Sequence, residues 1–202
     1  MTDSAVDLDQ LYDPPSGTIV KGVMPRLLPF HIKYLEVATF FCLASGNANG
    51  LDASPRGGEP GFVHVLDEKT VAFADWPGNN RIDSLRNIND NSRIGMLFLF
   101  PGLEVFLRIN GHARISRDET LLLRLQERGR IPKTAIHVTI DEVFLHCGKA
   151  VNRAQLWRQA SRIEPTSVPS LGEMKAAMTG ENPTQTQALD ADYYREIRGD
   201  LY

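Results

Sequence analysis

Hydrophobic and polar residues alternate along residues 103–116, which predicts a long β-strand with two different faces. One face is apolar and the other is polar with a single aromatic side chain, Phe106. The apolar face consists of Val105, Leu107, Ile109, Gly111, Ala113 and Ile115. The alternation recurs in residues 135–147, so one face of this sheet is predicted to be core and the other polar.

Shorter strands are predicted upstream, each bounded by turn residues. A continuous run of apolar β-forming residues occupies 37–44, and Asn49-Gly50 then gives a hairpin signal before a strand in 51–54. Three more strands are expected, in 61–66, 70–74 and 93–100. About six antiparallel strands within about 110 residues, joined by short turns, favour a closed or nearly closed barrel.

Helices are expected beside this sheet, so the predicted fold class is mainly β with flanking helices (α+β). The expected helices are 31–36, 80–88, 118–128 and 171–179, with a basic amphipathic segment in 152–162. The helices of 118–128 and 171–179 each begin near a serine followed three residues later by glutamate, a capping box. We interpret 25–180 as the folded domain, 1–24 as an N-terminal arm and 181–202 as an acidic C-terminal arm.

Composition and charge narrow the classes of function. The chain has 202 residues, of which 42% are hydrophobic, and no apolar run approaches the roughly 18 residues of a membrane span. Residues 1–10 carry acids and no basic residue, unlike a secretory signal, so we expect a cytoplasmic protein without a membrane partner. Net charge is −4 in 1–20 and −3 in 181–202, leaving +4 for 21–180. A mildly basic body suits a small anionic ligand and argues against a nucleic-acid partner.

Motifs for common chemistries are missing from the sequence. There is no GxGxxG, P-loop, GxSxG or HExxH pattern, and neither Cys42 nor Cys147 has metal-ligand spacing, so no metal site is expected. The informative stretch is 75–86, where a strand ends in a Pro-Gly turn and a helix follows. Its first turn is expected to carry Asn79, Asn80, Arg81 and Ser84.

Two interpretations of this stretch remain open. Free backbone N–H groups at a helix start favour an anion, and the Arg81 guanidinium matches a phosphate. Alternatively, an asparagine caps the helix and Arg81 is a solvated charge. Arg56, Lys149 and Arg153 also lie beside strand ends, where each can reach an anion or face water.

Four segments stand out together. They are Asp52-Ala53-Ser54-Pro55-Arg56-Gly57, Gly61-Phe62-Val63, Pro77-Gly78-Asn79-Asn80-Arg81-Ile82-Asp83-Ser84-Leu85-Arg86-Asn87-Ile88 and Val143-Phe144-Leu145-His146-Cys147-Gly148-Lys149-Ala150. In order and spacing they resemble the pyridoxamine 5'-phosphate oxidase-related family. The resemblance implies an FMN-binding split β-barrel, usually a homodimer with FMN in the cleft between its subunits.

The resemblance also implies site residues. Contacts with the FMN phosphate are implied for Asn79, Asn80, Arg81 and Ser84. The cofactor is implied to be lined by Ser54, Arg56, Phe62 and Val63, and to be reached by Lys149 and Arg153. The polar face that carries Phe106 is a candidate dimer contact.

One departure from the family bears on the reaction. The true oxidases carry a basic C-terminal segment that binds substrate pyridoxal phosphate, whereas residues 190–202 here are acidic. We therefore expect an FMN-dependent oxidoreductase that does not make pyridoxal phosphate, and no side chain is identified as catalytic. The alternative is a non-enzymatic protein that holds flavin, deazaflavin or haem on the same barrel.

Overall fold

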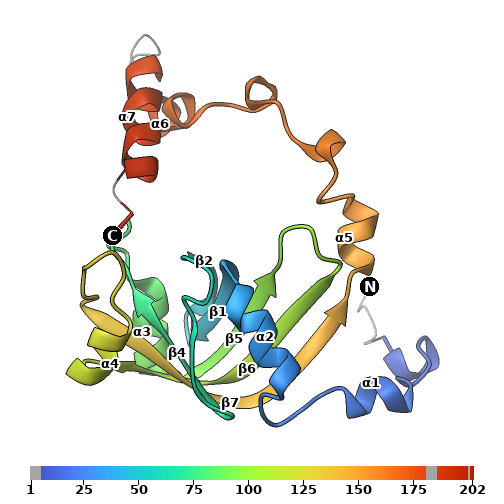
Figure 1. Ribbon diagram of the computed structural model, residues 1–202. Coiled ribbons are helices and arrows are strands. Elements are labelled where there is room, and N and C mark those ends of the chain that lie inside the picture. Colours follow the sequence, from blue (N-terminus) through green and yellow to red (C-terminus); the bar gives the residue numbers. More distant parts are fainter. Residues whose placement is uncertain (1–5, 181–185, 200) are drawn as a thin grey trace.

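The computed structural model describes residues 6–180, 186–199 and 201–202. Within them, seven strands form one antiparallel sheet in the order β2-β1-β5-β6-β7-β4-β3 (Figure 1). The strands are β1 (Phe40–Asn47), β2 (Gly50–Gly57), β3 (His64–Asp67), β4 (Thr70–Asp75), β5 (Arg93–Leu99), β6 (Val105–Ser116) and β7 (Thr134–Cys147). The sheet curls without closing, since β2 and β3 each pair on one side only.

This architecture confirms the predicted α+β split barrel. Each expected strand segment forms a strand, although some ends differ. The largest difference lies in 61–63, which is a turn rather than the start of β3. The Phe62 N–H there bonds the Glu59 carbonyl oxygen at 3.0 Å, and Gly61 has a φ of 82°. A left-handed residue of this kind interrupts an extended strand, and glycine adopts it without strain.

The core lies inside the curled sheet and is centred on Phe41. Its ring lies 5.0 Å from Phe73 and from Phe98, and 5.6 Å from Phe62, measured between centroids. All four side chains are buried. The predicted apolar face of β6 points into this core, and Leu107 and Ile109 are fully buried. Close aromatic packing of this type contributes beyond the apolar area that it buries.

A β-bulge bends the two longest strands. The register of β6 against β7 shifts between Asn110 and Gly111, leaving Asp141 unpaired. Gly111 is required here because a Cβ atom at this position would lie 2.1 Å from the Thr139 carbonyl oxygen. The bulge separates two halves of the outer sheet surface, and helices cover these two halves to different extents.

Helices cover the sheet unevenly. They are α1 (Gly17–Lys21), α2 (Pro29–Val37), α3 (Asp83–Asp90), α4 (Glu119–Arg124), α5 (Lys149–Ala154), α6 (Leu171–Thr179) and α7 (Thr186–Gly199). Short 3-10 turns occupy Leu8–Gln10, Gln159–Ser161 and Pro165–Ser167. Near α4, the outer side of β4 and of the first half of β7 is covered by an apolar cluster around Leu125. No helix covers the second half of β7 in this way in the described part of the chain.

Two expected helices are shorter than their patterns suggested. The helix of 118–128 ends at Arg124, and its continuation is a turn in which Arg128 and Gly129 both have positive φ. The basic segment of 152–162 begins its helix earlier, at Lys149, and ends it at Ala154, because Gln155 is left-handed with a φ of 50°. The amphipathic pattern extended beyond these residues, but backbone reversals end the helices first.

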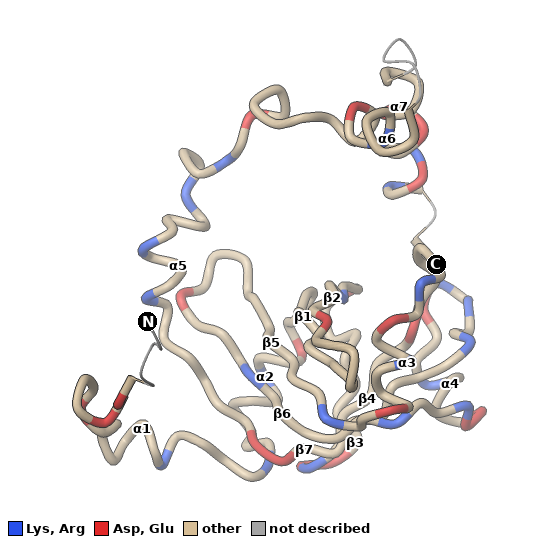
Figure 2. Tube along the Cα trace, turned by 180° about the vertical axis from the view of Figure 1, so that it is seen from behind, with Lys and Arg blue, Asp and Glu red and all other residues tan. Residues whose placement is uncertain are grey.

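The C-terminal region forms an arch over the open side of the sheet (Figures 1 and 2). It leaves the body at α5, and α6 and α7 contact one another at its far side. The predicted domain boundary at 180/181 thus separates two helices that pack together. Parts of the predicted arms, residues 1–5, 181–185 and 200, lie outside the described residues.

His31 makes the stability depend on pH. Its ring is 1% exposed, and its Nδ1 accepts the Leu28 N–H at 3.0 Å, which holds the start of α2. Burial lowers the pKa of His31 below its ordinary value of 6.5. The unfolded chain therefore takes up this proton at a higher pH than the folded protein. We expect the neutral His31 to make its whole contribution to the free energy of unfolding above pH 6.5. That contribution should be lost as the pH falls through the pKa of the folded protein.

Urea unfolding of wild type and His31→Gln between about pH 5 and pH 8 tests this expectation. Glutamine does not titrate and its amide oxygen can accept the same N–H. The variant should therefore lose less stability on acidification than wild type. Residual dependence is expected, because burial also lowers the pKa of His64, His137 and His146. Equal slopes for the two proteins would contradict the role of His31.

Candidate functional site

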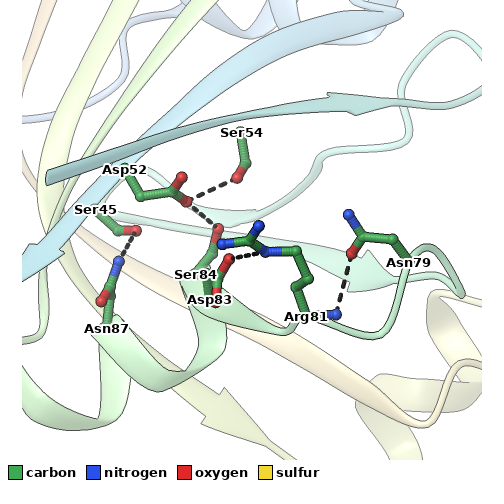
Figure 3. Close-up of polar contacts among 8 residues, drawn as sticks. All are labelled: Ser45, Asp52, Ser54, Asn79, Arg81, Asp83, Ser84 and Asn87. Carbon is green, nitrogen blue, oxygen red and sulfur yellow. Dashed lines mark hydrogen bonds and ion pairs between the residues drawn. The ribbon is translucent and has the colours of Figure 1, made fainter. Parts of the chain in front are cut away.

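Polar side chains gather where β2 faces the start of α3. Asp52 lies at the centre, and its Oδ2 accepts hydrogen bonds from the hydroxyls of Ser54 at 2.8 Å and Ser84 at 3.1 Å (Figure 3). Alternate residues of β2 share a face, which brings Asp52, Ser54 and Arg56 to the same side. We call Asp52, Ser54, Arg56, Asp75 and the segment 76–84 the polar corner.

A second contact fixes α3 against the sheet. Asn87 Nδ2 donates to Ser45 Oγ at 3.1 Å, and the two residues are 8% and 4% exposed (Figure 3). This bond joins α3 to β1, as the Ser84–Asp52 bond joins it to β2. The position of the turn that precedes α3 therefore depends on two buried or half-buried hydrogen bonds.

The turn before α3 is longer than predicted. The helix begins at Asp83 rather than at Asn80, because Asn80 and Ile82 are left-handed, with φ of 58° and 51°. Left-handed backbone is rare for a β-branched residue such as Ile82, so the surrounding contacts must hold it. Of the four residues predicted to bind phosphate, Asn79, Asn80 and Arg81 lie in this turn and only Ser84 lies in the helix.

The side chains of the turn are oriented by local bonds. The Arg81 N–H donates to Asn79 Oδ1 at 3.1 Å, and the Arg81 Nε donates to Asp83 Oδ2 at 2.7 Å (Figure 3). The Arg81 side chain is 74% exposed. Asp83 engages Nε, so both terminal nitrogens of the guanidinium remain available to a ligand. Ser84, in contrast, is 2% exposed and already donates to Asp52.

Arg56 and Asp75 are two charged groups held partly out of water. Burial lowers the pKa of Arg56, while the carboxylates of Asp75 and Asp52 oppose that shift. Burial likewise raises the pKa of Asp75, against the opposing effect of Arg56. The Arg56 Nη1 donates to the Pro55 carbonyl oxygen at 2.8 Å. Two buried nitrogens, Arg56 Nε and Trp76 Nε1, have no partner among the described residues.

Phe62 and Val63 are placed differently from the other predicted residues. They are 7% and 2% exposed and belong to the hydrophobic core. Their side chains are committed to packing, and Phe62 stacks on Phe41. Any cofactor contact from this segment must therefore come from its backbone.

A second concavity lies on the uncovered half of the outer sheet surface. It has a volume of about 570 Å³ and is mainly apolar. Its lining residues are Cys42, Ala44, Ala53, Gly95, Met96, Leu97, Phe106, Arg108, Asn110, His146, Cys147 and Ala150. We call it the sheet hollow. The face with Phe106, predicted as a dimer contact, forms part of its floor.

One polar group organises the floor of the sheet hollow. Glu142 Oε1 accepts from Arg108 Nη2 at 2.7 Å and from Asn110 Nδ2 at 2.8 Å. The Arg108 guanidinium also lies 5.7 Å from the centre of the Phe144 ring. Burial lowers the pKa of His146, and the charge of Arg108 lowers it further. His146 therefore presents a neutral imidazole to the sheet hollow near pH 7.

Lys149 and Arg153 lie at the rim of this hollow, not in the polar corner. Both are exposed residues of α5, and Ala150 between them lines the hollow. The strand β7 separates the two places, since Asp75 pairs with Thr134 at its start and α5 follows its end. At about 3.3 Å per residue, that strand is roughly 45 Å along its path. A single chain does not bring all the predicted site residues together.

The sequence interpretation assigned no role to several residues of these two places. Asp52 and His146 belong to the quoted segments, but only the fold shows Asp52 bonding two serines and His146 facing the hollow. Asp75 and the Arg108–Glu142 pair gave no local signal. Their partners come from strands or helices far away in the sequence.

The comparisons with known proteins identify the family. A model of the family described as pyridoxamine 5'-phosphate oxidase matches residues 30–147, more than half of the chain. The chain belongs to the pyridoxamine 5'-phosphate oxidase family. The matched range spans the whole sheet, including the polar corner and the lining of the sheet hollow except Ala150, and ends just before α5. No curated protein matches the chain.

Solved structures of similar fold each cover about three fifths of the chain. HupZ of Group A Streptococcus is 22% identical, with 59% of this chain and 94% of that one covered and a TM-score of 0.48. A Lactobacillus delbrueckii protein named for pyridoxamine 5'-phosphate oxidase is 17% identical, with 60% and 95% covered and a TM-score of 0.48. The FAD binding protein of Mycobacterium smegmatis is 17% identical, with 61% and 97% covered and a TM-score of 0.42.

Two further properties hold for the part of the chain that the structure describes. No helix there has both the length and the apolar character that a membrane crossing requires. No group of three or more His, Cys, Asp or Glu side chains there is arranged to hold a metal ion.

Removal of the Asn87–Ser45 hydrogen bond is predicted to lower the free energy of unfolding. Asn87→Ala leaves a buried hydroxyl at Ser45 without its partner, so the free energy of unfolding should fall by about 1–3 kcal/mol. Asn89→Ala is the matched control, because it makes the same change at an exposed position of the same helix. That variant should stay within about 0.5 kcal/mol of wild type. Chemical denaturation measures both, and equal effects would show that the bond does not anchor α3.

Proposed function

We propose that this protein binds FMN between the subunits of a homodimer and acts as a flavin-dependent oxidoreductase. Membership of the family supports a flavin. The observation that carries the proposal is the pair of buried, unpartnered donors, Arg56 Nε and Trp76 Nε1, at the base of the turn before α3. Buried donors of this kind are costly unless a ligand or water satisfies them.

The polar corner suits the phosphate end of FMN. The free terminal nitrogens of Arg81 can donate two parallel bonds to a phosphate. The unbonded N–H groups at the start of α3 add positive electrostatic potential. The Ser84 hydroxyl donates to Asp52 Oδ2, and the Arg81 Nε pairs with Asp83 rather than with Asp52.

Two copies explain the distribution of the basic residues. The polar corner and the Lys149 region lie at opposite ends of β7, and FMN is far shorter than that strand. In a two-fold dimer, the Lys149 of one subunit can approach the polar corner of the other. The sheet hollow, with its half-buried Phe106 and exposed Leu97, is the contact surface proposed for this dimer.

FMN, when bound, supplies the hydride and electron transfer chemistry. The chain contributes orientation, charge and exclusion of water. The basic residues would hold the anionic phosphate, and the neutral His146 can donate or accept one hydrogen bond in the sheet hollow. The acidic residues of α7 do not suit a second phosphate, so pyridoxal phosphate is not the proposed product. Bleaching of bound FMN by NADH or NADPH tests the reaction.

Arg81 is predicted to recognise the phosphate specifically. A charge-assisted hydrogen bond contributes about 1.5–3 kcal/mol, so Arg81→Ala should raise the Kd for FMN by about 10- to 150-fold. Riboflavin has no phosphate, and its affinity should change little. Arg86→Ala on the exposed side of α3 is the matched control and should leave both ligands unaffected. Fluorescence titration measures the Kd of both ligands. An unchanged Kd for FMN in Arg81→Ala would show that Arg81 is a solvated charge and does not bind the phosphate.

A mixed dimer tests whether the site is shared between subunits. Arg81→Ala and Lys149→Ala chains are co-expressed with different affinity tags, and the heterodimer is isolated. If each site takes Arg81 from one chain and Lys149 from the other, one site is intact and one lacks both residues. FMN titration should then show half of the sites at wild-type affinity. If both residues come from one chain, every site carries one defect and no site binds normally.

A further inference from the structure

The C-terminal arm is held to the body only near its ends. We define it as the described residues 155–180 and 186–199. At its start, Trp157 Nε1 donates to the Leu103 carbonyl oxygen at 2.8 Å. Beyond its other end, the Tyr202 ring packs edge-on against Trp76 at 5.1 Å, with the Arg128 guanidinium 5.1 Å from its centre. Past Trp157, the hydrogen bonds of the described arm join arm residues to one another.

One face of helix α6 packs against α7. Gly172 and Ala176 are buried, and the Gly172 N–H donates to Asp190 Oδ1 of α7 at 2.7 Å. A Cβ atom at Gly172 would lie 2.3 Å from the Thr186 carbonyl oxygen, so the two helices approach closely. This face of α6 is therefore packed against α7.

The opposite face of α6 is apolar and has no partner within the described chain. Leu171, Met174 and Met178 follow the i, i+3, i+7 spacing of one helical face, and they are 37%, 41% and 79% exposed. A short helix pair with an exposed apolar stripe gains little stability by itself, because most helical stability comes from burying such a stripe. The stripe requires a surface to cover it.

The arch carries α6 and α7 away from the sheet and returns to the body only at the end of the chain (Figures 1 and 2). The hollow is the half of the outer sheet surface that α4 leaves uncovered, and Leu97 in its lining is 37% exposed. Two apolar surfaces of one chain, the stripe and the hollow, thus remain exposed although the arm is anchored at both ends.

We propose that the arm embraces a second copy of this chain, which lies against the sheet hollow and is covered on its far side by α6 and α7. This inference rests on the dimer of the proposed function. A two-fold pair uses the same patch of both subunits, so each arm would embrace the other body. Charge supports this occupant, because residues 155–202, which include the arm, carry a net charge of −2 and the body in 21–154 carries +3. The acidic end of each arm meets a basic body.

Photo-crosslinking of the full-length protein tests the embrace directly. Benzoylphenylalanine replaces Met178, so each chain carries one crosslinker on the exposed stripe. A band of dimer mass after irradiation can then arise only from residue 178 reacting with another chain. We expect such a band, with the crosslinked peptide mapping by mass spectrometry to residues 30–147. The band should disappear in samples diluted below the Kd of the dimer.

Paired variants test the energetics. Met174→Gln with Met178→Gln removes the apolar stripe, and Lys175→Gln on the same helix is the matched control. All three changes exchange residues of similar helix propensity, so α6 itself should persist. Burying the two methionines predicts that the double variant raises the dimer Kd at least about tenfold, whereas the control leaves it unchanged. Sedimentation velocity measures the Kd.

The outcomes separate this inference from the proposed function. If the protein is a dimer with FMN bound, but residue 178 reacts only within its own chain, the embrace is wrong and the interfacial cofactor stands. An unchanged Kd in the double variant would likewise overturn the embrace alone. A clean monomer with FMN bound would overturn both, because no second subunit would then complete the site or fill the arm.

Discussion

The outer surface of the sheet must be covered, and the chain covers only half of it. The bulge at Gly111 divides β6 and β7 into two halves. On one side, the cluster around Leu125 of the α4 region packs over β4 and β7. On the other, an apolar hollow of about 570 Å³ remains. Exposed apolar surface of this kind is costly in water and usually marks an interaction site. The proposed dimer and the proposed contact of the arm with a second copy would both cover this surface.

The polar corner balances a second cost, the desolvation of charge. Burial opposes ionisation of both Arg56 and Asp75, and their mutual attraction offsets part of it. The Asp52 carboxylate accepts hydrogen bonds from Ser54 and Ser84, and the second of these bonds joins β2 to α3. The turn between β4 and α3 is therefore held in a left-handed conformation that an isolated peptide would rarely adopt. A turn that is already ordered in this way lowers the entropic cost of binding a ligand.

Much of the fold could be predicted from local patterns. Alternation assigned the two faces of β6 correctly, because the period of a strand is a property of the backbone alone. Helix ends were less predictable. Asparagine tolerates the positive φ of Asn80, but Ile82 and Gln155 adopt positive φ against their own preferences, which contacts made elsewhere in the fold must impose. The sequence predicts strand at 61–63, but these residues form a turn, and its apolar side chains fill the core without an extended backbone.

By itself, the sequence determined the strands and the two faces of β6, since these depend on periodicity. The resemblance of four of its segments indicated the split-barrel class and the family, since these segments consist of residues adjacent in the chain. Only the tertiary structure decided that Phe62 and Val63 are core residues, that Asp52 joins β2 to α3, and that Lys149 lies far from Arg81. Each of these depends on which strands lie side by side. That arrangement is set by burial of the whole core and leaves no trace in any single segment.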